Sequence, residues 1–206
     1  MPRLLSTVQV IAATRNSSNY SRPMYQFLVA ILLIISKADS SQRGYNYTST
    51  MIQWKSFNFT YGTVEFRAKM AGGQGTWSTV WLLGSNCQQT NVPGADNVPP
   101  CNWPERGSDE IDSAEIYGGL TTVQQSGDSG SIYSYSASTT DVSQNWHVYQ
   151  LVWTPDSLKW KIDGVTTHTV TSGVPSTPMF LLNRNGFGRD CRRYHRRFNA
   201  APDDVD

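Results

Sequence analysis

The chain has 206 residues and a formal net charge of +1; 16% of its residues are charged and 12% are aromatic, with seven Trp and ten Tyr. This length is enough for one domain with a sizeable core, and the near-zero net charge gives no indication of binding to nucleic acid or to an anionic membrane. A sequence rich in aromatic residues and poor in charged ones favours an all-β domain with many turns.

Residues 1–43 lack the alternation of apolar and polar residues expected of strands, and we treat them as an atypical N-terminal segment. Within them, residues 27–35 (FLVAILLII) form one long apolar run. Its nine residues are far fewer than the roughly 20 that a membrane-spanning helix needs. Read from Met24, the stretch has the length of the hydrophobic part of a signal peptide, but its leading region lacks Lys and Arg. A buried strand is the alternative, and the sequence leaves both open.

From Tyr45 onward, short segments alternate apolar and polar residues, as residues 64–70 (VEFRAKM) do, and turn signals separate them. Asp163-Gly164 is typical of a type I′ turn that closes a hairpin. Short, evenly spaced strands without helical periodicity predict a β-sandwich or a β-barrel. The predicted strands are residues 51–57, 62–70, 76–83, 110–117, 148–153, 159–162 and 166–171.

Two of the three cysteines, Cys87 and Cys101, lie in a polar, Pro-rich stretch. A disulfide between them would close a short loop and would indicate an exported protein. A reduced pair in a cytosolic protein is the alternative. The three histidines are scattered and no CxxC is present, so the sequence shows no spacing of metal ligands.

Residues 109–117 (DEIDSAEIY) carry the acidic side chains on which a functional prediction depends. In a strand, Glu110 and Asp112 project to one face, whereas Glu115, at an odd offset from Glu110, would project to the other. One extra residue, a β-bulge near Ser113-Ala114, would return Glu115 to the face of the other two acids.

Three carboxylates on one strand face repel one another, which costs stability unless that face has a function. A solvated acidic edge is the alternative. A retaining glycosidase needs two carboxyls about 5–5.5 Å apart, one ionised as the nucleophile and one protonated as the general acid. The aromatic composition agrees with this function, because the flat faces of pyranose rings stack on aromatic planes.

Three sequence blocks occur together: GTWSTVWLLG at 75–84, WP at 103–104 and EIDSAE at 110–115. In this order they resemble glycoside hydrolase family 16, in particular its laminarinase-like members (endo-β-1,3-glucanases). Further similar blocks are YTSTMI at 47–52, FTYGTVEFRAK at 59–69, WHVYQLVWTPD at 146–156 and IDG at 162–164. The resemblance covers roughly residues 45–182, and from it we predict a catalytic domain over residues 44–182.

The resemblance implies a jelly-roll β-sandwich, concanavalin-like, in which one concave sheet forms an open cleft for a β-glucan chain. It implies that Glu110 is the nucleophile, that Glu115 is the general acid/base and that Asp112 hydrogen-bonds the nucleophile. It also implies positions at or beside the cleft that contact substrate. These are Trp77, Trp81, Trp103 and His147, for which core packing or a structural hydrogen bond is the alternative.

The function implied is that of a secreted, monomeric, retaining endo-glycosidase that cleaves β-1,3 or mixed β-1,3/1,4 glucan. We expect no cofactor, no nucleic-acid partner and no membrane partner, and a structural calcium stays open. A non-catalytic, lectin-like module is the main alternative, because such a module needs the aromatic residues but not the acid pair. A β-agarase, a carrageenase or a transglycosylase is a third alternative, because related members of the family use the same strand and the sequence does not separate them.

Two departures from the family pattern bear on the prediction. Ser113 stands where a large aliphatic residue is usual, and a buried hydroxyl there needs a partner or costs ~1–3 kcal/mol. Residues 183–206 form an atypical basic tail that contains Arg189, Arg192, Arg193, Arg196 and Arg197. A one-base shift of the reading frame near Leu182 would restore family-like residues. We therefore keep an inactive, frame-shifted product with an incomplete sandwich as a further alternative.

Overall fold

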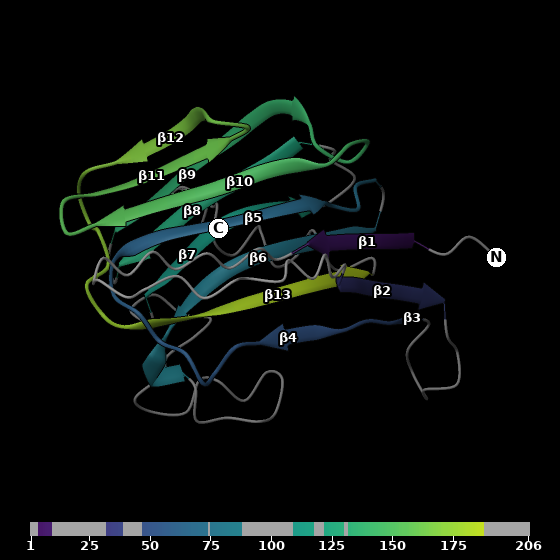
Figure 1. The fold of residues 1–206 in the computed structure, drawn as a ribbon, viewed down its shortest axis with the longest axis horizontal. Helices are drawn as coiled ribbons and strands as arrows, with labels where there is room; N and C mark the ends of the chain where they lie inside the picture. The colour runs from purple at the N-terminus through teal and green to yellow at the C-terminus, as the bar shows by residue number, and fades with distance from the viewer. Residues whose placement is uncertain are drawn as a thin grey trace, which may run out of the picture.

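The computed structural model describes residues 4–9, 32–38, 47–73, 75–87, 109–117, 122–129 and 132–187, which form two packed antiparallel sheets (Figure 1). The seven-stranded sheet consists, in spatial order, of β12 (Val165–Val170), β11 (Ser157–Ile162), β10 (His147–Thr154), β5 (Gly62–Lys69), β1 (Leu4–Gln9), β2 (Leu32–Ala38) and β3 (Tyr47–Thr48). The six-stranded sheet consists of β4 (Met51–Gln53), β13 (Met179–Phe187), β6 (Thr76–Gly84), β7 (Glu110–Tyr117), β8 (Thr122–Ser129) and β9 (Ile132–Asp141).

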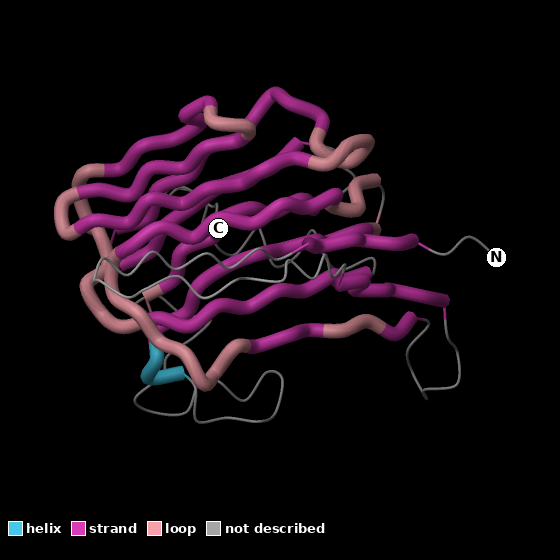
Figure 2. Tube along the Cα trace, viewed as in Figure 1, coloured by secondary structure: helices cyan, strands magenta, loops and turns pink. Residues whose placement is uncertain are grey.

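Strands account for most of the described residues, with one short 3-10 helix, η1 (Ser85–Cys87), after β6 (Figure 2). The predicted all-β sandwich is confirmed. Among the described residues, no helix is long and apolar enough to cross a membrane.

The core lies between the two sheets and follows the period-two alternation of their strands. Tyr149, Leu151 and Trp153 on β10 are 0–1% exposed, and the residues between them are only half-buried. Facing them across the sandwich, β7 contributes Ile111 to the same cluster as Leu151 and Trp153. This alternation fixes which face of each strand is left for function, because a one-residue change of register would expose the core.

The predicted segments all fall on strands, with small differences at their ends. The segment 51–57 is the largest difference, since β4 ends at Gln53 and the backbone N–H of Trp54 donates instead to the carbonyl of Leu181. The predicted hairpin is confirmed: β11 pairs with β12, and Asp163 and Gly164 have φ values of 50° and 82°, as a type I′ turn requires.

Strands β8 and β9 were not predicted, because their sequences, TVQQSGDS and IYSYSASTTD, are rich in Ser, Thr and Gln and give a weak apolar alternation. Two further strands fall within the first 43 residues. Of the two interpretations of the apolar run, the structure has a strand at Leu32–Ala38, in which Ile34 and Ser36 are buried while Leu33 and Ile35 are exposed.

Strand β13 continues past Leu182, the end of the predicted domain, and pairs with β6 as far as Phe187. Its residue Asn185 is 1% exposed and is held from both sheets. Ser36 of β2 donates to the Asn185 carbonyl at 2.5 Å, and Ser78 of β6 donates to Asn185 Oδ1 at 2.9 Å. The Asn185 amide in turn donates to the carbonyl of Ile34 at 3.4 Å. A polar side chain is tolerated in this core because it is hydrogen-bonded.

Candidate active site

Strand β7 contains the predicted bulge, and the extra residue is Ser113. In the pairing with β6, Val80 lies opposite Ala114 and Trp81 lies opposite Asp112, so Ser113 has no partner across the ladder. In the pairing with β8, Asp112 lies opposite Ser126 and Glu115 opposite Gln124, which gives the same one-residue shift. The odd sequence offset therefore becomes an even number of steps along the sheet.

The bulge brings Glu110, Asp112 and Glu115 to one face of β7. Ile111, Ala114 and Ile116 are 0% exposed in the core, so the three acids project from the opposite, outer face of the six-stranded sheet. We call this the acid face. Glu110 and Asp112 are half-buried, and Glu115 is 7% exposed.

The neighbouring strand β6 places Trp77, Thr79 and Trp81 on the acid face. Thr79 pairs with Glu115, and Trp77, two residues before Thr79 on β6, is the next side chain on the same face. The indole Nε1–H of Trp77 donates to Glu115 Oε1 at 2.5 Å. Trp77 thus presents its N–H edge to a carboxyl of the site, and this hydrogen bond restricts how the Glu115 side chain can rotate.

Strand β7, which we call the acid strand, is also hydrogen-bonded from the seven-stranded sheet. Trp160 of β11, which is 0% exposed, donates its indole N–H across the sandwich to the carbonyl oxygen of Asp112 at 3.0 Å. That carbonyl immediately precedes the bulge residue, Ser113. A side chain of the seven-stranded sheet therefore fixes the backbone of the acid strand where its regular pairing is interrupted.

Two residues of the acid face were missed by the sequence analysis. Arg184 of β13 places its Cζ 4.5 Å from the centroid of the Trp77 ring. Thr79 lies between Arg184 and Glu115 in the pairing and is 6% exposed. Within the described part of the chain, its Oγ1 has no hydrogen-bond partner. The pairing of β13 with β6 reveals the position of Arg184, and the pairing of β6 with β7 reveals that of Thr79.

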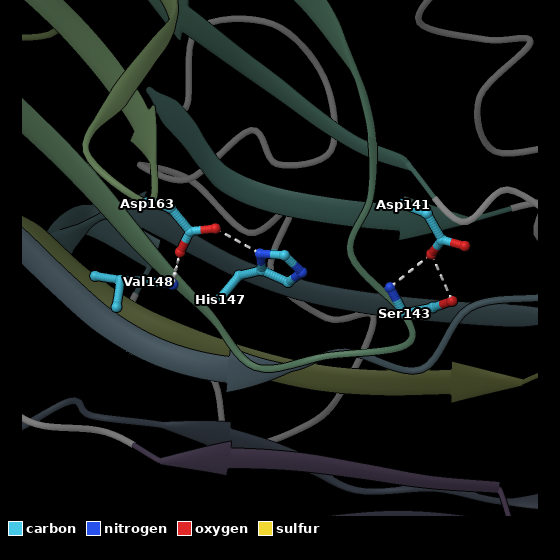
Figure 3. A network of polar contacts seen from close by, with 5 residues as sticks. All are labelled: Asp141, Ser143, His147, Val148 and Asp163. Atoms are coloured by element: carbon cyan, nitrogen blue, oxygen red, sulfur yellow. Dashed lines mark hydrogen bonds and ion pairs between the residues drawn. The ribbon is translucent and has the colours of Figure 1, made fainter.

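The structure does not bring His147 to the acid face. His147 belongs to β10 in the seven-stranded sheet, where it pairs with Ala68 of β5. Its Nδ1 lies 2.6 Å from Asp163 Oδ2, and the other carboxylate oxygen of Asp163 accepts the N–H of Val148 at 2.8 Å (Figure 3). His147 therefore makes a structural hydrogen bond with Asp163, which was the alternative to a substrate contact.

These contacts lower the pKa of the Asp163 carboxyl. Partial burial by itself raises its pKa, but the hydrogen bonds from Val148 and His147 and the charge of His147 outweigh burial, and the net pKa is lowered. The ionised form is therefore favoured in the folded protein, where it anchors the β11–β12 turn to β10.

Trp81 lies opposite Asp112 but is only 7% exposed, packed in an apolar cluster with Leu83, Phe180 and Leu182. Its contacts support packing, and its predicted contact with substrate stays a prediction. Cys87 forms a disulfide whose partner is outside the described residues.

Cys101 and Trp103 also lie outside the described residues, so the predicted pairing of Cys87 with Cys101 and the role of Trp103 stay predictions. In the described ranges, no three His, Cys, Asp or Glu side chains are grouped so that they could hold a metal ion.

Comparison with known proteins identifies a family. The sequence model of the glycosyl hydrolases family 16 matches residues 30–182. Glucan endo-1,3-beta-glucosidase A1 of Niallia circulans is 30% identical over 127 residues, which are 61% of this chain and 18% of that protein. A beta-glucanase of Rhodothermus marinus is 28% identical over 141 residues, 64% of this chain and 46% of that protein. The chain thus spans less than half the length of these curated relatives.

Solved structures agree with the sequence comparison. The catalytic domain of an endo-1,3-beta-glucanase (laminarinase) from Thermotoga petrophila superposes with a TM-score of 0.60 at 25% identity, covering 75% of this chain and 67% of that one. The laminarinase catalytic domain of Thermotoga maritima gives a TM-score of 0.60 at 26% identity, with 76% and 66% covered. The sandwich is the jelly roll that the sequence resemblance implied.

Proposed function

The chain belongs to family 16 of the glycosyl hydrolases, and we propose that it cleaves internal bonds of a β-glucan with net retention of anomeric configuration. The observation that carries this proposal is the bulge at Ser113, which places Glu110, Asp112 and Glu115 on one face. Two carboxyls on one face suit the two roles, nucleophile and general acid/base, that retaining hydrolysis requires.

In the first step, the ionised carboxylate of Glu110 attacks the anomeric carbon and forms a glycosyl ester. The glycosidic C–O bond breaks, and the protonated carboxyl of Glu115 gives its proton to the leaving oxygen. Glu115 suits this role because it lies on the same face of β7 as Glu110 and its carboxyl is oriented by the indole N–H of Trp77. Asp112 lies between them and hydrogen-bonds the nucleophile in this proposal.

In the second step, the Glu115 carboxylate removes a proton from water as the water oxygen attacks the anomeric carbon. The ester bond to Glu110 breaks, and the enzyme returns to its starting protonation state. The hydrogen bond from Trp77 to Glu115 supports the proposal because it holds one carboxyl oxygen in place and leaves the other to exchange the proton.

For the substrate we propose β-1,3 or mixed β-1,3/1,4 glucan, in keeping with the names of the relatives, which include an endo-1,3-1,4-beta-glycanase of Rhizobium meliloti. We further propose that the protein acts as a secreted monomer. The disulfide at Cys87 supports export, because structural disulfides persist in oxidising compartments.

The test is the release of reducing ends from laminarin and from a mixed-linkage glucan by the wild type, Glu110→Gln and Glu115→Gln. We expect the Glu110→Gln change to lower kcat by at least roughly 10³-fold, because no covalent intermediate can form. NMR of the first product formed should show the β-anomer. Wild type no faster than Glu110→Gln would contradict hydrolysis and favour a glucan-binding module, and an initial α-anomer would contradict retention.

A further inference from the structure

We propose that Arg184 is a positioning residue of this site: through the indole of Trp77, it holds the carboxyl of Glu115 in the orientation that proton transfer needs. The inference rests on the proposed function and adds a residue to it. Arg184 lies beyond residues 30–182, the part of the chain that the family model matches.

The first observation is a chain of two contacts. The guanidinium carbon of Arg184 lies 4.5 Å from the centre of the Trp77 ring, and the N–H of that ring donates to Glu115 Oε1 at 2.5 Å. Attraction of a cation to an aromatic face is strongest for Trp. A cation over the ring also withdraws electron density from it, so the indole N–H becomes a stronger donor toward the carboxylate.

The second observation is the register that makes this chain possible. Arg184 of β13 pairs with Thr79 of β6, and Thr79 pairs with Glu115 of β7, so the three residues form one row across the sheet. Strands are spaced by ~4.8 Å, so Arg184 and Glu115 originate roughly 10 Å apart. Trp77 extends over this distance from the neighbouring row.

Space for the guanidinium comes from Gly186, which pairs with Trp77. A Cβ built at residue 186 would lie 2.9 Å from the nearest guanidinium nitrogen of Arg184, so any larger residue would displace that group. The arginine therefore lies along β13 over Gly186, and from there it covers a face of Trp77.

The third observation is the distribution of charge. In the six strands of this sheet, as the structure describes them, Arg184 is the only Lys or Arg, whereas β7 alone carries three carboxylates. The one cation in these strands thus lies on the tryptophan that contacts Glu115. Arg184 acts on Glu115 through Trp77, so its loss should disturb chemistry more than binding.

The chain supplies a matched control. Arg67 of β5 places its Cζ 4.8 Å from the ring centre of Trp146, which is a similar Arg–Trp pair. Arg67 belongs to the seven-stranded sheet, where it pairs with Val148. Removing the Arg67 charge tests the general cost of losing a cation–π pair without touching the acid face.

The kinetic experiment compares Arg184→Met, Arg184→Lys and Arg67→Met on laminarin. Arg184→Met should lower kcat roughly tenfold with KM changed by less than about twofold, since misplacing an acid–base group slows proton transfer without removing binding contacts. Arg184→Lys keeps the cation and should recover most of the loss. Arg67→Met should match the wild type.

A substrate with an activated leaving group separates positioning from a structural defect. A 2,4-dinitrophenyl β-glycoside needs no proton from Glu115 to form the glycosyl ester, so kcat/KM of Arg184→Met on it should be within about twofold of wild type. An equal loss on both substrates, or no loss on laminarin, would overturn the inference. In the Trp77→Phe background, which lacks the N–H donor, adding Arg184→Met should have no further effect on laminarin.

A readout without turnover distinguishes failure of the positioning role from failure of the proposed function. In an NMR spectrum of ¹⁵N-indole groups, the Trp77 resonance is assigned by its absence in Trp77→Phe. Arg184→Met should shift this proton and speed its exchange with water, whereas Arg67→Met should not. Wild type inactive on every glucan would refute the function alone; an unshifted Trp77 resonance in Arg184→Met would refute the positioning role even with an active enzyme.

Discussion

The hydroxyl of Ser113 is buried at the bulge of the acid strand. Ser113 is 1% exposed, and within the described residues its Oγ has no hydrogen-bond partner. The sequence analysis expected a penalty for a hydroxyl at this position, and the structure confirms that the group is buried and unsatisfied. A donor stripped of water without a partner lowers the free energy of unfolding.

We predict that Ser113→Ala raises the free energy of unfolding by about 1 kcal/mol, because it removes an unsatisfied polar group. Ser78→Ala is the matched control: its hydroxyl is also buried but lies 3.0 Å from the Ala71 carbonyl and 2.9 Å from Asn185 Oδ1. This control should lose about 1 kcal/mol. Urea denaturation measures both, and a loss of stability in Ser113→Ala would contradict the interpretation.

At the scale of the element, the acid strand depends on a partner in the other sheet. Trp160 donates to the Asp112 carbonyl at 3.0 Å, next to the residue that has no ladder partner. Trp153, on the adjacent strand β10, makes a bond of similar length, 2.9 Å, to the carbonyl of Pro175. The two tryptophans are equally buried, but only Trp160 is bonded to β7.

We predict that Trp160→Phe and Trp153→Phe each lower the free energy of unfolding by roughly 1–3 kcal/mol, because each leaves a carbonyl without its donor. Only Trp160→Phe should also lower kcat on laminarin, since the Asp112 backbone is then free to shift relative to Glu110 and Glu115. The assay is run well below the melting temperature of both variants. Equal activities would show that the bulge keeps its geometry without Trp160.

How far the sequence predicts this site depends on the range of the interactions. The bulge at Ser113 was predictable from local spacing, because Glu110 and Glu115 are an odd number of residues apart and need one extra residue to share a face. The contact of Trp77 with Glu115 and the position of Arg184 depend on which strands become neighbours. The pairing that places Arg184 is long-range, because β13 is more than 90 residues after β6 in the chain.

The sequence analysis missed β8 and β9 because their apolar alternation is weak and their formation depends on neighbouring strands. β8 and β9 are held by their neighbours in the sheet, from β7 outward, and not by a strong apolar pattern of their own.

His147 was predicted beside the cleft from its position in a family block, whereas its partner, Asp163, comes from a turn 16 residues later.

At the scale of the whole molecule, stability depends on pH through groups of the seven-stranded sheet, outside the acid face. His168 on β12 stacks on Trp160, with ring centroids 5.0 Å apart, and burial lowers its pKa. Its folded-state pKa thus lies below the unfolded value near 6.5, and the unfolded chain binds more protons between the two. Stability therefore falls as pH drops from about 7 through this interval.

We predict that His168→Phe, which keeps the stacking and removes the titration, makes the free energy of unfolding less dependent on pH between about 7 and 5. The dependence at lower pH should persist. Asp163 has a lowered pKa, so its contribution is present above its unfolded value near 4 and disappears as pH falls through the folded pKa. Urea denaturation at a series of pH values measures both, and an unchanged slope between pH 7 and 5 would exclude His168 as its source.

The position of β13 has a consequence for how the molecule is made. β13 is the last described strand in the sequence, yet it lies between β4 and β6, which come much earlier. During synthesis, β4 and β6 must wait with open hydrogen-bonding edges until residues 179–187 leave the ribosome. Assembly of this sheet is therefore expected to be slow and exposed to aggregation, and a chaperone that shields the two edges should raise the yield of folded protein.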